Sequence, residues 1–291
     1  MVGVESVVIF PDYHLPFWLQ NSILSPIYGQ HEIIFQADNR DRFNPCGCLY
    51  GLRGYIICFM NEEETNIEDS AFRWIKNNEK AIIEKFASGV GYVSDIQPTT
   101  LFMAGSPGAG KTEISKRFMA RWKQKPIRID ADEIRTMCPQ YSGSNAHLFQ
   151  KAANKGVNIL YDYALGKGLN VILDGTFAYA GAIENIERSL KRNRKVEIFF
   201  VSQNPEQAWG FTKKREVLES RRVSKEVFIN AYFKSQENVN NAKKHFIDEI
   251  ELHLIIKDFE KDLEQIEFNI QSVDPFIKKR YSRDELEKVL I

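Results

Sequence analysis

Residues 105–112 read GSPGAGKT and match the pattern G-x-x-x-x-G-K-[ST] at every fixed position. The pattern follows an apolar segment typical of a buried strand and precedes a segment with helical periodicity. Glycines let backbone N–H groups converge on phosphate oxygens, and the N-terminus of the following helix adds positive potential. We therefore expect a phosphate-binding loop (P-loop) for ATP or GTP. Its members are Gly105, Ser106, Pro107, Gly108, Ala109, Gly110, Lys111 and Thr112.

Within this loop, the two final residues have distinct expected tasks. Lys111 is expected to reach the β- and γ-phosphates, and the Thr112 hydroxyl is expected to ligate Mg²⁺. The alternative is a glycine-rich turn with no ligand. The lysine, the threonine and both flanking elements agree with the phosphate-binding interpretation.

Two aspartates follow the next apolar segment, PIRID at residues 126–130. In a parallel sheet the carboxyl ends of neighbouring strands line one crevice, where ligands bind. Asp130 or Asp132 would face the γ-phosphate there, and a carboxylate can orient a hydroxyl nucleophile and accept its proton. Either aspartate can instead cap the helix that follows.

A third acid and a group of basic residues complete the candidate site. NVILDGT at residues 170–176 places Asp174 at the end of a buried strand, where a carboxylate can hold Mg²⁺ through water, although Asp-Gly also forms turns. Thr176 is expected at the mouth of an acceptor pocket. Cations further along can stabilise transferred phosphoryl oxygens or form a solvated helix face. These are Lys213, Lys214, Arg215, Arg221 and Arg222.

The elements that position these residues alternate between strand and helix from residue 99 onward. This alternation predicts an α/β fold of the P-loop NTPase, nucleotide-kinase-like type, with a parallel sheet covered by helices on both faces. Expected strands are residues 99–105, 126–130, 169–175, 195–202 and 251–259. Expected helices are residues 111–122, 145–167, 180–192, 205–219 and 224–246, and a capping box at Ser282 opens a last one.

The first part of the chain has a different character. Short apolar runs at residues 6–10, 31–35 and 54–60 predict strands, separated by turn-rich stretches, and residues 68–86 have helical periodicity. We therefore predict an N-terminal strand-and-turn module at residues 1–62, a linking helix at 63–94 and a P-loop kinase domain at 95–291. The apolar and aromatic group between Phe10 and Trp18 is too small to form a large core alone.

Composition excludes several classes of protein. Lys plus Arg equals Asp plus Glu, at 39 each in 291 residues, which argues against a surface built for nucleic acid or an anionic membrane. No segment has the apolar length of a membrane span, and the start of the chain does not resemble a signal peptide, so we expect a cytoplasmic protein. Cys46, Cys48 and Cys58 lie close in sequence, but C-x-C is not a zinc pattern, and thiols in a reducing compartment are expected.

The order GSPGAGKTE, RIDADEIR, NVILDGT and then Arg-x-Ser/Thr after a basic helix resembles the zeta toxin family of P-loop kinases. The resemblance covers about residues 65–245. It implies a fold like that of small nucleoside and shikimate-type kinases. It also implies phosphorylation of the amino-sugar 3′-hydroxyl of UDP-N-acetylglucosamine. Family members are silenced by a partner antitoxin or by an inhibitory domain on the same chain.

The resemblance also implies residue roles. Asp132 matches the general base, and Arg135 and Asn158 are expected to contact the acceptor. Other matches are Lys111 and Thr112 for the P-loop lysine and its hydroxyl neighbour, Asp174 and Thr176 for the family's E-G-T, and Arg215 and Arg222 for its two phosphate-binding arginines. Arg215 requires a one-residue shift in spacing. Two positions depart from the family: Ala178 replaces an arginine, and Asn158 falls where a glutamate contacts the substrate.

The expected function is therefore transfer of a γ-phosphoryl group to a small hydroxyl acceptor, with a sugar nucleotide as the favoured acceptor. A polynucleotide or small-metabolite kinase would use the same P-loop. A regulatory nucleotide binder without turnover remains a different class of alternative. Because the resembled family requires silencing, the N-terminal module is expected to restrain the kinase in cis or to recruit a partner, or else to be structural.

Overall fold

A computed structural model of the 291-residue chain describes residues 35–37, 49–51, 55–57, 62–88, 91–258, 263–277 and 279–291. The chain divides into two compact units, residues 1–70 and 71–291. The first unit contains an antiparallel sheet of order β1-β3-β2. Its strands are β1 (Phe35–Ala37), β2 (Leu49–Gly51) and β3 (Tyr55–Ile57). Strand β3 lies within a predicted strand, whereas β2 falls in a stretch predicted as turns.

Several N-terminal predictions lie outside the described residues. These are the strand at 6–10, most of the strand at 31–35, the apolar group between Phe10 and Trp18, and Cys46, Cys48 and Cys58.

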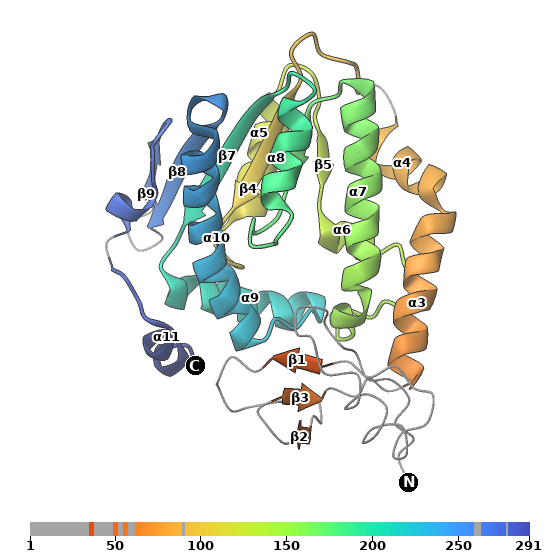
Figure 1. The fold of residues 1–291 in the computed structure, drawn as a ribbon, viewed down its shortest axis with the longest axis vertical. Coiled ribbons are helices and arrows are strands. Elements are labelled where there is room, and N and C mark those ends of the chain that lie inside the picture. The colour runs from red at the N-terminus through yellow and green to blue at the C-terminus, as the bar shows by residue number, and fades with distance from the viewer. Residues whose placement is uncertain are drawn as a thin grey trace, which may run out of the picture. The chain divides into compact units, whose positions relative to one another are not determined.

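The second unit is built on a sheet of order β5-β6-β4-β7-β8-β9 (Figure 1). Neighbours are parallel from β5 to β8, and β9 pairs antiparallel with β8. The strands are β4 (Thr99–Ala104), β5 (Ile127–Ile129), β6 (Val171–Leu173), β7 (Lys195–Ser202), β8 (Glu251–Asp258) and β9 (Leu263–Glu267). Strand β4, which leads into the P-loop, lies between β6 and β7. The prediction of a mainly parallel α/β sheet is confirmed.

Helices cover both faces of this sheet, so alternate residues of β4 are buried on opposite sides. Helix α5 packs Ile114 and Phe118 on the face that carries Leu101 and Met103. On the other face Ser189 of α8 donates to the Thr100 hydroxyl at 2.9 Å. Figure 1 shows α8 and α10 in front of the sheet, with α5 behind β4.

The helices of the described chain agree closely with the sequence pattern. They are α3 (Glu62–Asn77), α4 (Glu79–Ala87), α5 (Lys111–Arg121), α6 (Ala131–Arg135), α7 (Gln150–Lys167), α8 (Ala182–Leu190), α9 (Pro205–Glu219), α10 (Lys225–Phe246) and α11 (Arg283–Val289). The predicted capping box at Ser282 is present. No helix in the described ranges combines the length and the apolar character that crossing a bilayer requires.

The described chain differs from the sequence pattern in three places. The helix predicted at 68–86 is two helices, because the Asn78 amide side chain donates to the Trp74 carbonyl at 2.8 Å and ends the first of them. The helix predicted at 145–167 opens with a 3₁₀ turn, η2 (Ala146–Phe149). Strand β9, which was not predicted, is a mostly polar edge strand paired with β8.

Candidate functional site

The P-loop is a tight connection between β4 and α5 in which two glycines are sterically required. Gly105 and Gly108 have φ of 127° and 73°, which side-chain-bearing residues rarely adopt. A Cβ at Gly105 would lie 2.4 Å from the Val201 carbonyl oxygen, and one at Gly108 would lie 2.0 Å from the Ala208 carbonyl oxygen. The loop therefore packs directly against the end of β7 and the first turns of α9.

The remaining loop residues fix this conformation from several sides. Ala109 is buried in the core cluster that α5 shares with the sheet, and Gly110 is the N-cap of α5. The Gly105 N–H donates to the Thr176 carbonyl at 3.2 Å, which joins the loop to the segment after β6. Pro107 is partly exposed, whereas Ser106 is buried. The loop backbone is thus held in place by contacts of the protein itself.

Lys111 begins α5, and its side chain is buried. Its Nζ donates to the Ser106 carbonyl across the loop at 2.6 Å. Burial lowers the pKa of Lys111 to about 8; the Asp174 carboxylate opposes this shift, and Arg221 and Arg215 add to it. A buried ammonium gains from an anionic partner, so this side chain fits a nucleotide phosphate.

Arg128 of β5 joins three carboxylates, two at the start of α6 and one after β6. Its Nε and Nη2 donate to Asp174 Oδ2 at 2.9 and 2.6 Å, its Nη2 also donates to Asp130, and its Nη1 donates to Glu133. Ser115 of α5 donates to the same Asp174 oxygen at 2.7 Å. The Asp174 side chain is only 2% exposed. Its orientation is therefore set by donors from β5 and α5.

The two aspartates after β5 have different environments. Asp130 is the N-cap of α6, because its carboxylate accepts the Asp132 N–H at 2.9 Å. Burial raises the pKa of Asp130 to about 6, the neighbouring Asp132 and Asp174 carboxylates add to the rise, and Arg128 opposes it. The Asp132 side chain is 29% exposed. The capping position is thus taken by Asp130, and Asp132 is the aspartate accessible at the site.

Asp132 lies between two arginines. Arg135, one turn along α6, donates to Asp132 Oδ1 at 2.5 Å and also to the Gln150 side chain. Arg221 donates to Asp132 Oδ2 from the segment between α9 and α10. Both carboxylate oxygens therefore carry a charge-assisted hydrogen bond.

The basic residues of α9 and of the segment after it differ in how exposed they are and in which groups they contact. Arg215 is half-buried and close enough to contribute to the pKa of Lys111. The Arg222 side chain is 78% exposed and lies 3.9 Å from Glu216. Arg221, to which the sequence assigned no individual role, is the arginine that reaches Asp132.

Three other predicted site residues lie on α5, after β6 and on α7. Thr112 lies in the first turn of α5 and is partly exposed. Thr176 contacts the P-loop through its carbonyl, and its hydroxyl accepts the Ala178 N–H at 3.3 Å. Asn158 lies on the exposed side of α7.

Arg128 and Ser115 are site residues that sequence reasoning missed, and Arg221 was named without an individual role. Arg128 had a usable signal, because a lone charge inside a strand buried on both faces requires a buried partner. Arg221 was visible only as one member of a basic cluster, and Ser115 carried no signal beyond its place on the P-loop helix.

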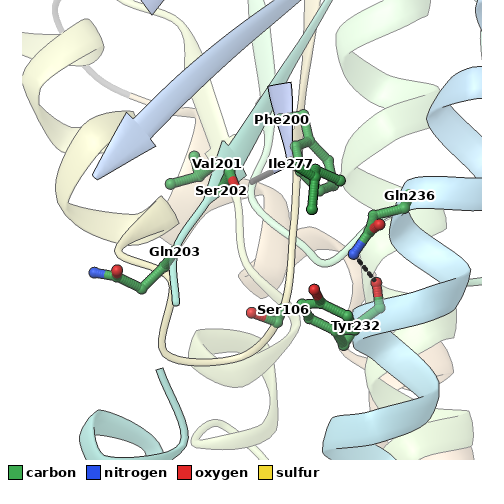
Figure 2. Close-up of a pocket in the computed structure, with 8 residues that line it drawn as sticks. All are labelled: Ser106, Phe200, Val201, Ser202, Gln203, Tyr232, Gln236 and Ile277. Carbon is green, nitrogen blue, oxygen red and sulfur yellow. Dashed lines mark hydrogen bonds between the residues drawn. The ribbon is translucent and has the colours of Figure 1, made fainter. Parts of the chain in front are cut away.

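A small pocket adjoins the P-loop on the side of α10. Figure 2 shows Tyr232 and Gln236 projecting from α10 on the side of Ser106, whereas Gln203 at the end of β7 points the opposite way. The buried Gln203 amide uses its oxygen to accept the Asn204 N–H at 2.7 Å. The pocket thus joins the loop to the end of β7, but no charged side chain lines it.

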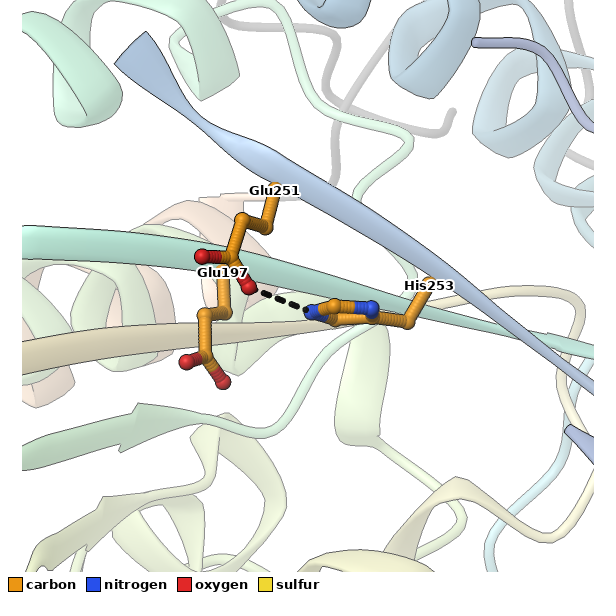
Figure 3. Close-up of side chains that lie close together, drawn as sticks. All are labelled: Glu197, Glu251 and His253. Carbon is orange, nitrogen blue, oxygen red and sulfur yellow. Dashed lines mark ion pairs between the residues drawn. The ribbon is translucent and has the colours of Figure 1, made fainter. Parts of the chain in front are cut away.

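Another group of possible metal ligands lies at the amino ends of β7 and β8. The side chains of Glu197, Glu251 and His253 converge there (Figure 3). Lys195 Nζ already lies 2.5 and 3.1 Å from the two carboxylates. His253 Nδ1 accepts the Asn269 N–H at 3.1 Å, so Nε2 carries the proton that faces Glu251. Because a metal would have to displace this proton and Lys195, the group is best described as an ion-pair network.

Comparisons with known proteins agree with the fold. The family model described as Zeta toxin matches residues 69–264, which is more than half of the chain. A solved chain of the PezAT chromosomal toxin–antitoxin system of Streptococcus pneumoniae has a TM-score of 0.53 and 17% identity, covering 79% of this chain and 96% of that chain. The AvrRxo1-ORF1:-ORF2 structure with ATP has a TM-score of 0.49 and 13% identity, covering 75% and 70%. Comparison with curated proteins gave no match. By the extent of the family match, the chain belongs to the zeta toxin family.

Proposed function

We propose that the chain is a kinase that transfers the γ-phosphoryl group of ATP or GTP to a hydroxyl of a small acceptor. The observation that carries this proposal is the P-loop with its buried Lys111, whose charge lies within electrostatic reach of Asp132. Lys111 follows β4 and Asp132 follows β5, and these two parallel strands flank β6. A phosphate site beside an accessible carboxylate is the arrangement that phosphoryl transfer to a hydroxyl requires.

Each group has a proposed task. The P-loop N–H groups and Lys111 bind the β- and γ-phosphates, and Asp132 orients the acceptor hydroxyl and takes its proton. Arg215 and Arg222 are proposed to stabilise charge on the transferring oxygens, and Arg222 would have to move inward from its exposed position to do so. Thr112 and Asp174 offer the hard oxygen ligands that suit Mg²⁺, which neutralises phosphate charge when bound.

The proposed acceptor is UDP-N-acetylglucosamine or a related sugar nucleotide, with Arg135, Asn158 and Thr176 as its contacts. Membership of the zeta toxin family supports this choice. The same membership and the PezAT likeness support a toxin of a toxin–antitoxin pair, silenced by an antitoxin or by the N-terminal module. The neutral, exposed Asn158 and the small Ala178 favour testing several acceptors rather than one.

Single-turnover transfer from γ-labelled ATP and GTP tests the proposal. The acceptors are UDP-N-acetylglucosamine, a 5′-hydroxyl oligonucleotide and a panel of small sugars, each with the wild type, Lys111→Ala and Asp132→Asn. Labelled product from one acceptor, lost in both variants, supports the kinase and identifies its substrate. Nucleotide binding without transfer to any acceptor would favour a regulatory binder, and wild-type turnover in Lys111→Ala would contradict the P-loop assignment.

A further inference from the structure

Asp132 is already occupied on both of its oxygens. Arg135 bonds Oδ1, and Arg221 bonds Oδ2. A carboxylate that is to accept a proton from a hydroxyl must come within hydrogen-bonding distance of it, about 2.6–3.2 Å between heavy atoms. Each carboxylate oxygen can accept two hydrogen bonds, so withdrawal of one arginine would free an acceptor position on Asp132 for the hydroxyl.

The two arginines are not equally free to leave. Arg135 belongs to the same short helix as Asp132, its side chain is 8% exposed, and Gln150 holds it as well. Arg221 approaches from the non-helical segment between α9 and α10, and its side chain is 24% exposed. The residue before it, Ser220, has a φ of 55°. Arg221 is thus the partner that can withdraw without disturbing α6.

Arg221 also has a second anionic destination nearby. The Arg221 charge helps to lower the pKa of Lys111, and the proposed function assigns Lys111 to the β- and γ-phosphates. The planar guanidinium binds phosphate oxygens in the same two-donor geometry as it binds a carboxylate. A bound nucleoside triphosphate would therefore compete with Asp132 for this arginine.

We propose that Arg221 exchanges partners during the reaction, leaving Asp132 for the γ-phosphate when the nucleotide binds and so opening Asp132 to the acceptor hydroxyl. This inference rests on the proposed function and adds an order to it: nucleotide first, acceptor second. It also assigns to Arg221 a contact with the transferring group. In the ligand-free protein this ion pair occupies part of the Asp132 carboxylate.

A double-mutant cycle on nucleotide affinity tests the exchange without knowledge of the acceptor. The probe is the non-hydrolysable analogue AMP-PNP with Mg²⁺, titrated calorimetrically into the full chain. If Asp132 and the nucleotide compete for Arg221, Asp132→Asn tightens binding by about threefold to tenfold, the range for a partly exposed ion pair. In an Arg221→Gln background the same substitution changes affinity by less than about twofold.

The cycle separates competition from simple repulsion, because loss of a negative charge near the phosphates would tighten binding in either background. An equal gain in both backgrounds would overturn the partner exchange and leave the proposed function standing. Absence of AMP-PNP binding to the wild type would overturn the proposed function and this inference with it. Lys214→Gln, which removes an exposed charge of the same basic cluster, is the matched comparison, and the Asp132→Asn gain should persist in it.

Arg221→Lys is a second variant in case the glutamine chain is unstable. It keeps the charge but not the two-donor fork, so it should retain part of the coupling to Asp132→Asn. Thermal unfolding of all variants with and without AMP-PNP checks that each is folded. A folded Arg221→Lys chain with no coupling would contradict the exchange.

Discussion

The depressed pKa of Lys111 predicts that nucleotide affinity falls steeply with rising pH. In the ligand-free protein burial sets the Lys111 pKa to about 8, against an ordinary value of 10.5. Phosphate binding stabilises the charged form, so the bound lysine keeps its proton to higher pH. Binding therefore takes up a proton between pH 8 and the pKa of the bound state, and affinity falls as pH rises through that window.

The magnitude follows from the charged fraction of the free lysine. With a pKa of about 8, roughly three quarters of the chains carry a charged Lys111 at about pH 7.5, and roughly 3% do at about pH 9.5. If only the charged form binds, affinity for AMP-PNP falls about 25-fold over this interval. A lysine at its ordinary pKa would lose only about 10% of its charge over the same interval.

Calorimetric titration of AMP-PNP at several pH values between about 7.5 and 9.5 measures this slope. The last ionisation of a phosphate group, with a pKa of about 6, lies below this range, and any ionisation remaining above pH 7.5 would strengthen rather than weaken binding to a cation. Lys111→Arg is the control, since a guanidinium stays charged throughout and its affinity, though altered, should not follow the same curve. A wild-type change below about twofold would refute both the burial of the charge and its role in binding.

Asp132→Asn should keep nucleotide binding but lower single-turnover transfer by about 10²–10⁴-fold, because an amide cannot accept the proton. Arg128→Met should lower the urea midpoint by the equivalent of about 3–5 kcal/mol, because it strands the buried Asp174 carboxylate, and Arg128→Lys should recover part of the loss. Asp130→Asn keeps the helix cap but removes a buried carboxylate whose pKa is raised, so this variant should be more stable than the wild type above pH 6, by up to about 3 kcal/mol. The stability difference should vanish as the pH falls from about 6 to 4, and urea unfolding at both pH values measures it. If the N-terminal module restrains the kinase, removal of residues 1–61 should raise transfer activity or increase growth arrest on expression. A folded truncated chain with unchanged activity would contradict that role.

The fold was predictable because its signals are local and repeated. Each strand of the parallel sheet is a short apolar run, and the helices between the strands show their 3.6-residue period. The P-loop pattern also fixed the strand before it and the helix after it. Strand β9 was not predicted, because most of its residues are polar and its position depends on tertiary pairing with β8.

The site was predictable only in part, because charge partners come from distant segments. Lys111, Asp132 and Asp174 stand at the ends of predicted strands, so their neighbourhood follows from the topology. The pairing of Arg221 with Asp132 joins residues 89 positions apart, and no local pattern encodes it. Likewise, Arg222 fits the family spacing, but its side chain lies at the surface and the adjacent Arg221 reaches Asp132 instead.

These pairings change how ligand binding at this site should be understood. The proposed nucleotide would enter beside several carboxylates, which is unfavourable unless cations compensate their charge. The protein supplies that compensation in advance: Arg128 holds Asp174 and Asp130, and Arg135 and Arg221 hold Asp132. The buried Arg128 pairs are fixed, because breaking them would leave charges stranded in the core. The partly exposed Arg221 pair can be exchanged at small cost, so the cation that moves in the proposed exchange is the one that holds the proposed base.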